Sequence, residues 1–95
     1  MELVKIDKVW DIICWKEDTN YGFRHIGVIM KNGQEVFRTK VCYRNRTYEE
    51  YEFQAILIHA IIKYTDKLDK EYKKQKKWEE IKREYRPLVD FLEKV

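Results

Sequence analysis

The segment Thr47-Tyr-Glu-Glu-Tyr-Glu-Phe-Gln-Ala-Ile-Leu-Ile-His-Ala-Ile-Ile62 combines apolar residues at helical spacing with carboxylates. Thr47 is a favourable helix N-cap, and the carboxylates of Glu49 and Glu50 suit the positive end of a helix dipole. Apolar residues recur through it at helical spacing: Tyr51, Ala55, Ile58 and Ile62, flanked by Ile56, Leu57 and Ile61. The segment therefore predicts a core helix over residues 47–65 that lies across a sheet.

The residues before this helix predict a three-stranded antiparallel meander. Segments rich in Ile, Val and aromatic residues run over residues 3–16, 23–31 and 34–43. Turn residues occupy positions 17–22, and Asn32-Gly33 is a strong two-residue hairpin signal because both residues tolerate positive φ. Strand 23–31 is therefore expected to pair with strand 34–43 on one side and with strand 3–16 on the other.

Side chains of the strand over residues 34–43 should alternate between two faces of the sheet. Apolar and aromatic side chains are expected to face the core helix: Phe37, Thr39, Val41 and Tyr43. A row of cations would then face outward, with one more in the polar turn that follows: Arg38, Lys40, Arg44 and Arg46. Such a row suits contacts to a phosphate backbone, and it equally suits a solvated strand face.

After Tyr64 the chain becomes rich in Lys and Glu and keeps only a sparse apolar stripe. These positions predict a charged amphipathic helix over residues 66–85, with a bend at residues 66–69: Leu68, Tyr72, Trp78, Ile81 and Tyr85. Pro87 restricts the residue before it and suits the first turn of a last short helix over 87–95. The expected fold is a single α+β domain of the type βββαα.

Composition narrows the class of protein. A hydrophobic fraction of 44% supports a compact core, and 39% charged residues with three Gly and one Pro are typical of long helices and thermophile-like proteins. Cys14 and Cys42 lack the further ligands of a zinc site, so both are expected to be small buried side chains. The longest apolar run, residues 55–62, is too short for a bilayer, so no membrane partner is expected and a cytoplasmic location is assumed.

The net charge of +3 is distributed unevenly. Residues 63–86 contain ten basic and six acidic side chains, whereas residues 1–62 contain nine of each. The positive excess therefore lies on the segment after the core helix. Nucleic acid, an acidic protein surface and a simply solvated helix face are all compatible with it.

Part of the chain resembles the first half of the ribonuclease H-like superfamily. The resemblance is carried by Ile26-Gly-Val-Ile-Met30, by the Asn-Gly turn, and by Glu52-Phe-Gln-Ala-Ile-Leu-Ile-His-Ala-Ile61. It implies that Glu52 is a ligand of Mg²⁺ or Mn²⁺, joined by an Asp from the first strand and one after the helix. Asp11 lies inside that strand and Asp18 at its end, of which Asp18 is the better candidate, and Asp66 is the residue available after the helix. Asp18 lacks the family's Asp-Gly context, and the family's late acidic residue has no counterpart here.

Three functions are compatible with these patterns. The first is a non-catalytic module, without cofactor, that binds nucleic acid or a nucleic-acid-processing protein, because basic side chains interleaved with aromatic rings suit phosphate neutralisation and base stacking. It would use these cations: Arg38, Lys40, Arg44, Arg46, Lys73 and Lys77. The aromatic residues expected to be exposed near them are Trp15, Tyr21 and Tyr48.

The second function is a protein-only interaction module, such as a small inhibitor of viral origin or a homodimeric subunit, with Tyr72, Trp78 and Tyr85 at its interface. The third is a divalent-metal-dependent nuclease that uses Asp18, Glu52 and Asp66, which would have to converge on ions roughly 4 Å apart. Nucleophilic hydrolases are disfavoured because neither cysteine has an expected His partner.

Overall fold

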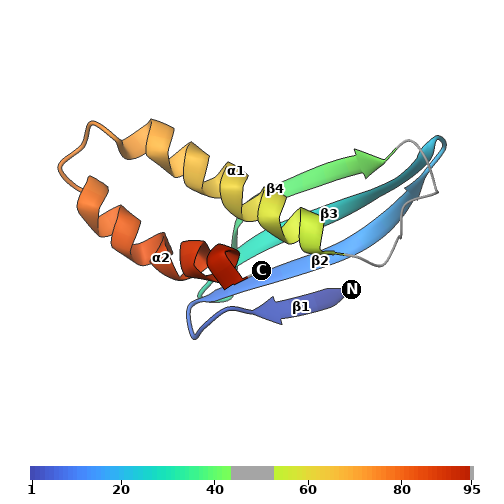
Figure 1. Ribbon diagram of the computed structural model, residues 1–95, viewed down its shortest axis with the longest axis horizontal. Helices are drawn as coiled ribbons and strands as arrows, with labels where there is room; N and C mark the ends of the chain where they lie inside the picture. Colours follow the sequence, from blue (N-terminus) through green and yellow to red (C-terminus); the bar gives the residue numbers. More distant parts are fainter. Residues whose placement is uncertain (44–52, 95) are drawn as a thin grey trace.

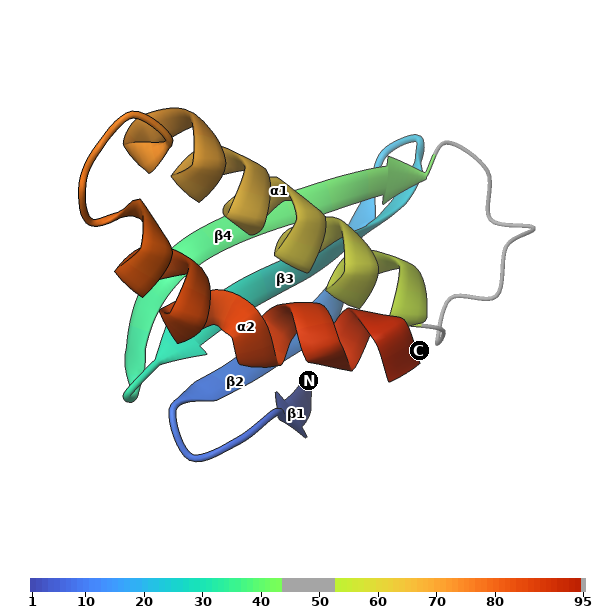
Figure 2. The same ribbon diagram turned by 60° about the vertical axis from the view of Figure 1, so that its left-hand side comes forward.

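Segments rich in Ile, Val and aromatic residues form a four-stranded antiparallel sheet, and two helices cover one of its faces (Figures 1 and 2). The computed structural model describes residues 1–43 and 53–94. The elements follow in the order β1 Glu2–Lys5, β2 Trp10–Thr19, β3 Gly22–Lys31, β4 Gln34–Tyr43, α1 Gln54–Tyr72 and α2 Trp78–Lys94. Each strand pairs with the next along the chain. The α+β class, with the sheet before the helices, is as predicted.

The first predicted strand, over residues 3–16, is two strands. Asp7 divides it, because its Oδ1 accepts hydrogen bonds from the backbone N–H of Val9 and of Trp10, each at 2.8 Å. The N–H groups of Ile6 and Asp7 in turn donate to the carbonyl of Trp10. Asx turns of this kind offer the backbone an alternative to the strand ladder. The sheet consequently has four strands and not three.

The hairpin between β3 and β4 is confirmed. Asn32 and Gly33 have φ values of 51° and 79°, and Lys31 pairs with Gln34 across the two-residue turn. The pairing shifts between Ile29 and Met30, which face Phe37 and Glu35 respectively. This bulge has a consequence for the surface, because it brings Glu35 onto the same side of the sheet as Arg38.

Gly27 sets where α1 lies on the sheet. A Cβ at this position would lie 3.0 Å from Cγ1 of Ile56 and 3.4 Å from Cβ of Ala60, so the helix approaches β3 more closely than a larger residue would allow. The buried side of α1 follows from this contact: Ile56, Leu57, Ala60, Ile61 and Tyr64.

The predicted buried side of the core helix was therefore centred on the wrong residues. Ala55 and Ile62 are exposed, and Ile58 is half-buried, whereas the residues expected only to widen the stripe form the core. Thr47 and Tyr51 lie outside the described residues. Phe53 occupies the N-cap position of α1 and makes no side-chain capping bond.

The helix boundaries after residue 65 also differ from the prediction. Helix α1 continues through residues 66–69 to Tyr72, and the chain reverses at residues 73–77, so the segment 66–85 is divided between two helices. Asp69 is accommodated within α1 because its Oδ1 accepts a hydrogen bond from the hydroxyl of Tyr85 on α2. The reversal falls where four of five residues are lysines and no apolar side chain is available for the core.

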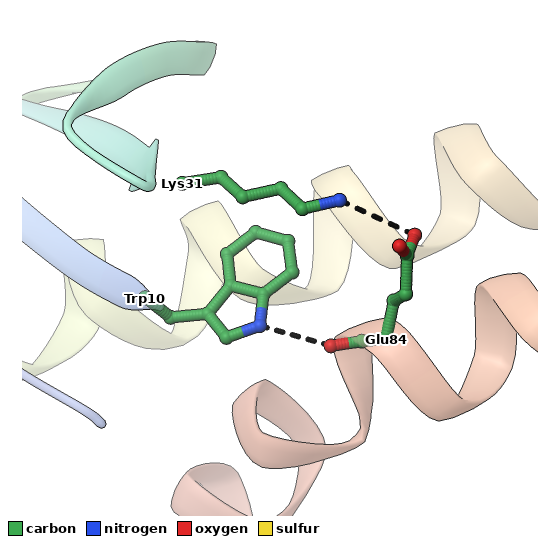
Figure 3. A network of polar contacts seen from close by, with 3 residues as sticks. All are labelled: Trp10, Lys31 and Glu84. Atoms are coloured by element: carbon green, nitrogen blue, oxygen red, sulfur yellow. Dashed lines mark hydrogen bonds and ion pairs between the residues drawn. The ribbon is translucent and has the colours of Figure 1, made fainter. Parts of the chain in front are cut away.

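Pro87 lies inside α2 and does not begin a separate helix over 87–95. Proline has no N–H to donate to the carbonyl four residues earlier, which opens the helical ladder at that turn. The carbonyl of Glu84 lies in the same turn, and it accepts a hydrogen bond of 2.9 Å from Nε1 of Trp10 (Figure 3). The Glu84 carboxylate also binds Nζ of Lys31 at 3.2 Å. These contacts connect α2 to β2 and to the end of β3.

The two cysteines have different environments. Cys14 is buried beneath α1, and burial raises the pKa of its thiol to about 11. Cys42 is exposed, so the expectation that both are buried was wrong for this residue, which faces away from the helices on the edge strand β4. Within the described residues, neither helix is long and apolar enough to cross a membrane.

Candidate nucleic-acid interface

The face of the sheet opposite the helices is uncovered by any described element (Figures 1 and 2). Strand register sorts its side chains into rows across β2, β3 and β4, including Trp15–Ile26–Lys40 and Ile13–Val28–Arg38. The outward position of Arg38 and Lys40 is as the alternation of β4 predicted, since both are exposed while their neighbours Thr39 and Val41 are half-buried. We refer to this surface as the open face.

Arg38 and Trp15 form the centre of the open face. The guanidinium carbon of Arg38 lies 5.4 Å from the centroid of the Trp15 ring, within the range of a cation–π contact. Its Nη2 also binds Oε1 of Glu35 at 2.8 Å, and this hydrogen bond raises the pKa of the guanidinium. Because Trp15 is on β2 and Arg38 on β4, the Arg38 side chain extends across β3.

Side chains from the flanking strands cover the central strand on this face. Val28 and Ile26 are only 3% and 8% exposed, although neither α1 nor α2 lies over them. Long charged side chains bury their aliphatic stems on apolar surface while their charged ends stay in water. Arg38 does this across β3, and Arg24 on β3 reaches Glu17 on β2 at 3.2 Å. The open face is therefore a mixed apolar, aromatic and cationic surface.

Lys40 is a cation on the open face that remains uncompensated among the described residues. Among residues 1–43 and 53–94, no carboxylate lies within ion-pair distance of its Nζ. Arg24 and Arg38 are each paired with a glutamate, at side-chain exposures between about a third and a half. Exposed pairs of this kind contribute little stability, so an incoming phosphate can compete for the two guanidinium groups.

Two of the remaining cations proposed from the sequence, Lys73 and Lys77, do not join this surface. Lys73 and Lys77 lie in the turn between α1 and α2, in the helical layer on the opposite side of the sheet. Arg44 and Arg46 lie outside the described residues. The structure thus separates two cationic surfaces, the open face and the lysine-rich turn of residues 73–77. Tyr21 is 85% exposed at the β2–β3 turn, and Tyr48 lies outside the described residues.

The three aromatic residues proposed for a partner interface are largely used within the chain. Tyr85 is 8% exposed, and its hydroxyl donates to Asp69. Trp78 meets Tyr85 edge to face, with ring centroids 6.4 Å apart, and both Trp78 and Tyr72 are half-buried. This stripe packs α2 against α1.

Two of the three acidic residues proposed for a nuclease, Asp18 and Asp66, are not brought together. Asp66 lies two residues after Tyr64 on α1, and the Tyr64 ring contacts Trp10 at the start of β2. Asp18 lies eight residues after Trp10 on β2, and a strand of this length spans roughly 26 Å. Glu52 lies outside the described residues, and within the described ranges no group of three His, Cys, Asp or Glu residues could hold a metal ion. Asp18 and Asp66 therefore cannot share a pair of ions.

Two features of this surface were missed from the sequence. Arg24 and its partner Glu17 belong to the open face, but Glu17 was taken as a turn residue because the turn was expected over residues 17–22. Strand β2 in fact continues to Thr19. The alternation Trp15, Glu17, Thr19 is the signal that could have identified them.

Comparisons with protein-family models, with characterised proteins and with solved structures gave no match to this chain. The likeness to the ribonuclease H-like superfamily stays a prediction. In residues 53–94, no strand follows α1; a second helix follows.

Proposed function

We propose that this chain is a small binding module for single-stranded nucleic acid, and that it binds through the open face. The observation that carries this proposal is the Arg38–Trp15 contact beside the uncompensated Lys40, on a sheet face that neither described helix covers. Aromatic rings provide stacking surfaces for bases, and adjacent cations neutralise the phosphates between them.

The shape of the surface favours single strands over duplexes. Reading a duplex requires an element that enters a groove, usually a helix or a two-stranded ribbon. The open face presents the broad side of a sheet, and both helices lie behind it. A single strand can lay its bases flat against such a surface, so a ring such as Trp15 is accessible to an unpaired base but not to a paired one.

Fluorescence anisotropy with a labelled 12-nucleotide single strand and a hairpin duplex of the same composition tests this proposal. The single strand should bind more tightly, and its affinity should fall as salt rises, with a slope of about −0.7 per phosphate contacted. Equal affinity for the two probes, or no binding of either at low salt, would contradict it.

Two matched double variants distinguish the two cationic surfaces. Arg38→Gln with Lys40→Gln and Lys73→Gln with Lys77→Gln each remove two positive charges from exposed positions. We expect the first pair to reduce the salt slope by about 1.4 and the second to leave it nearly unchanged. The reverse result would show that the oligonucleotide binds at the lysine-rich turn and not at the open face.

A second candidate is self-association or protein binding through the same face. It is favoured by Leu3, which pairs with Ile13, lies on the open face and is 65% exposed. Sedimentation of the chain with and without the oligonucleotide separates the two functions. A monomer that binds the oligonucleotide supports the first, whereas a dimer that the oligonucleotide leaves intact supports the second.

A further inference from the structure

A groove of about 350 Å³ lies between α1 and α2, near the turn that joins them. Its walls are mainly aromatic and aliphatic: Trp10, Tyr64, Leu68, Tyr72, Ile81 and Tyr85. Its polar lining consists of Lys31, Lys77 and Glu84. An apolar cavity of this size with few polar groups has the composition of small-molecule sites, at the lower end of their usual range of volumes.

The aromatic floor of the groove is held rigidly. Trp10 is almost fully buried, and its Nε1 donates to the Glu84 carbonyl (Figure 3). Tyr64 meets the Trp10 ring edge to face, with ring centroids 5.9 Å apart. Tyr85 is fixed on the other wall by its hydrogen bond to Asp69. The accessible wall is formed by half-buried side chains, chiefly Leu68, Tyr72 and Ile81. A ligand would meet a preformed surface.

The charges in the lining favour an anion. The carboxylate of Glu84 is already bound by Nζ of Lys31 at 3.2 Å, and the same ammonium lies 5.5 Å from the Trp10 ring centroid. Lys77 has no ion-pair partner within residues 1–43 and 53–94, and it belongs to a five-residue turn that holds four lysines. Among the three charged residues that line the groove, Lys77 is therefore the one without an ion-pair partner in the described parts of the chain.

We propose that this groove binds a small planar aromatic anion, with the ring against the wall formed by Leu68, Tyr72 and Ile81 and the acidic group on Lys77. The volume accommodates one fused ring system with a short acidic arm. The site lies in the helical layer, on the other side of the sheet from the open face. The proposal does not depend on nucleic-acid binding, and either function can be lost without the other.

A charge series built on one ring tests the proposal. Indole-3-acetate, indole-3-acetamide and tryptamine share the indole ring and carry a negative, a neutral and a positive group. In titrations followed by amide chemical shifts, the carboxylate should bind about three- to tenfold more tightly than the amide, and tryptamine should bind most weakly. The largest shifts should fall on Leu68, Lys77 and Ile81.

Two lysine variants locate the anion contact. Lys77→Gln should abolish the preference for the carboxylate over the amide. Lys74→Gln removes one positive charge from the same turn at a position outside the groove, so this variant should retain the preference. Both positions are exposed, so the fold should be unaffected.

Four results would each overturn the proposal. They are equal affinity for the three compounds, no binding at millimolar concentration, shifts centred on the open face, and equal losses in the two variants. Failure here would leave the oligonucleotide assays unaffected, because Arg38 and Lys40 lie on the opposite face. The two proposals can thus be rejected separately.

Discussion

Single residues determine how closely the layers of this protein approach. Gly27 is the clearest case, because α1 occupies the space that its missing side chain leaves. The Asn32–Gly33 turn is the second, because positive φ at both positions permits the tight hairpin that aligns β3 with β4. Gly27 acts through steric contact and the Asn32–Gly33 turn through backbone conformation. Substitutions at the two places should therefore destabilise the fold for different reasons.

Gly27→Ala should destabilise the fold by about 1–3 kcal/mol, because the new methyl group would lie 3.0 Å from Cγ1 of Ile56. Chemical denaturation measures this loss. In a double-mutant cycle with Ile56→Ala, which removes the contacted atom, the second substitution should cost less in the Gly27→Ala background than in the wild type. Additive losses would show that the two residues do not meet.

Gly33→Ala should cost about 1–2 kcal/mol through backbone strain alone, since φ is 79° and no other atom lies within 4 Å of the position of a Cβ. Gly33→Asn is the matched control because asparagine tolerates this conformation better. Denaturation midpoints should rank wild type above Gly33→Asn and Gly33→Ala lowest. An alanine variant as stable as the wild type would contradict a left-handed residue here.

At the level of secondary-structure elements, polar contacts decide where strands and helices begin and end. Asp7 separates β1 from β2, and the Trp10–Glu84 hydrogen bond holds α2 at the turn that Pro87 opens. Neither junction follows from apolar periodicity, because each depends on a side chain that satisfies backbone groups.

Asp7→Ala should destabilise the protein by about 1–2 kcal/mol, because it leaves the N–H groups of Val9 and Trp10 without their acceptor. Asp7→Asn keeps an oxygen at the same position and should recover most of the loss. Amide hydrogen exchange should show faster exchange in β1 of the alanine variant only. Equal exchange in both variants would mean that Asp7 does not hold the turn.

Considered as a whole, the molecule has two layers with different chemistry on their outer surfaces. The helical layer carries the lysine-rich turn and the groove, and the sheet carries the open face. The interior between them contains several acids that burial keeps protonated: the pKa values of Cys14, Tyr64 and Tyr85 are all raised. The fold as a whole should therefore be sensitive to alkaline pH.

Burial, helped by the hydrogen bond to Asp69, raises the pKa of Tyr85 from 10.0 to about 12. Between these pH values the unfolded chain binds fewer protons at this residue than the folded one, so stability should fall as the pH rises from 10 to 12. Tyr85→Phe removes this titration, and the slope of its stability against pH should be shallower over that window. Parallel curves from urea denaturation would contradict the assignment.

Local patterns were sufficient for the features that depend on neighbouring residues. The α+β class, the β3–β4 hairpin, and the alternation that places Arg38 and Lys40 outward could all be predicted, because turn chemistry and period-two alternation are properties of a few adjacent residues. The grouping of distant cations could not be predicted in this way, since Lys73 and Lys77 were grouped with Arg38 and Lys40 and the sheet separates the two pairs.

Tertiary packing decided the rest. The side of α1 that is buried depends on the space at Gly27, and the helical periodicity of the sequence does not reveal this space. Helix α1 continues to the turn at residues 73–77, and Asp69 within it accepts a hydrogen bond from Tyr85 on α2. The groove and the Arg38–Trp15 contact join residues from different elements, at separations that no local pattern encodes. The chain alone therefore specified the α+β class, the β3–β4 hairpin and which β4 side chains face outward. Only the packing of the elements specified which side chains meet.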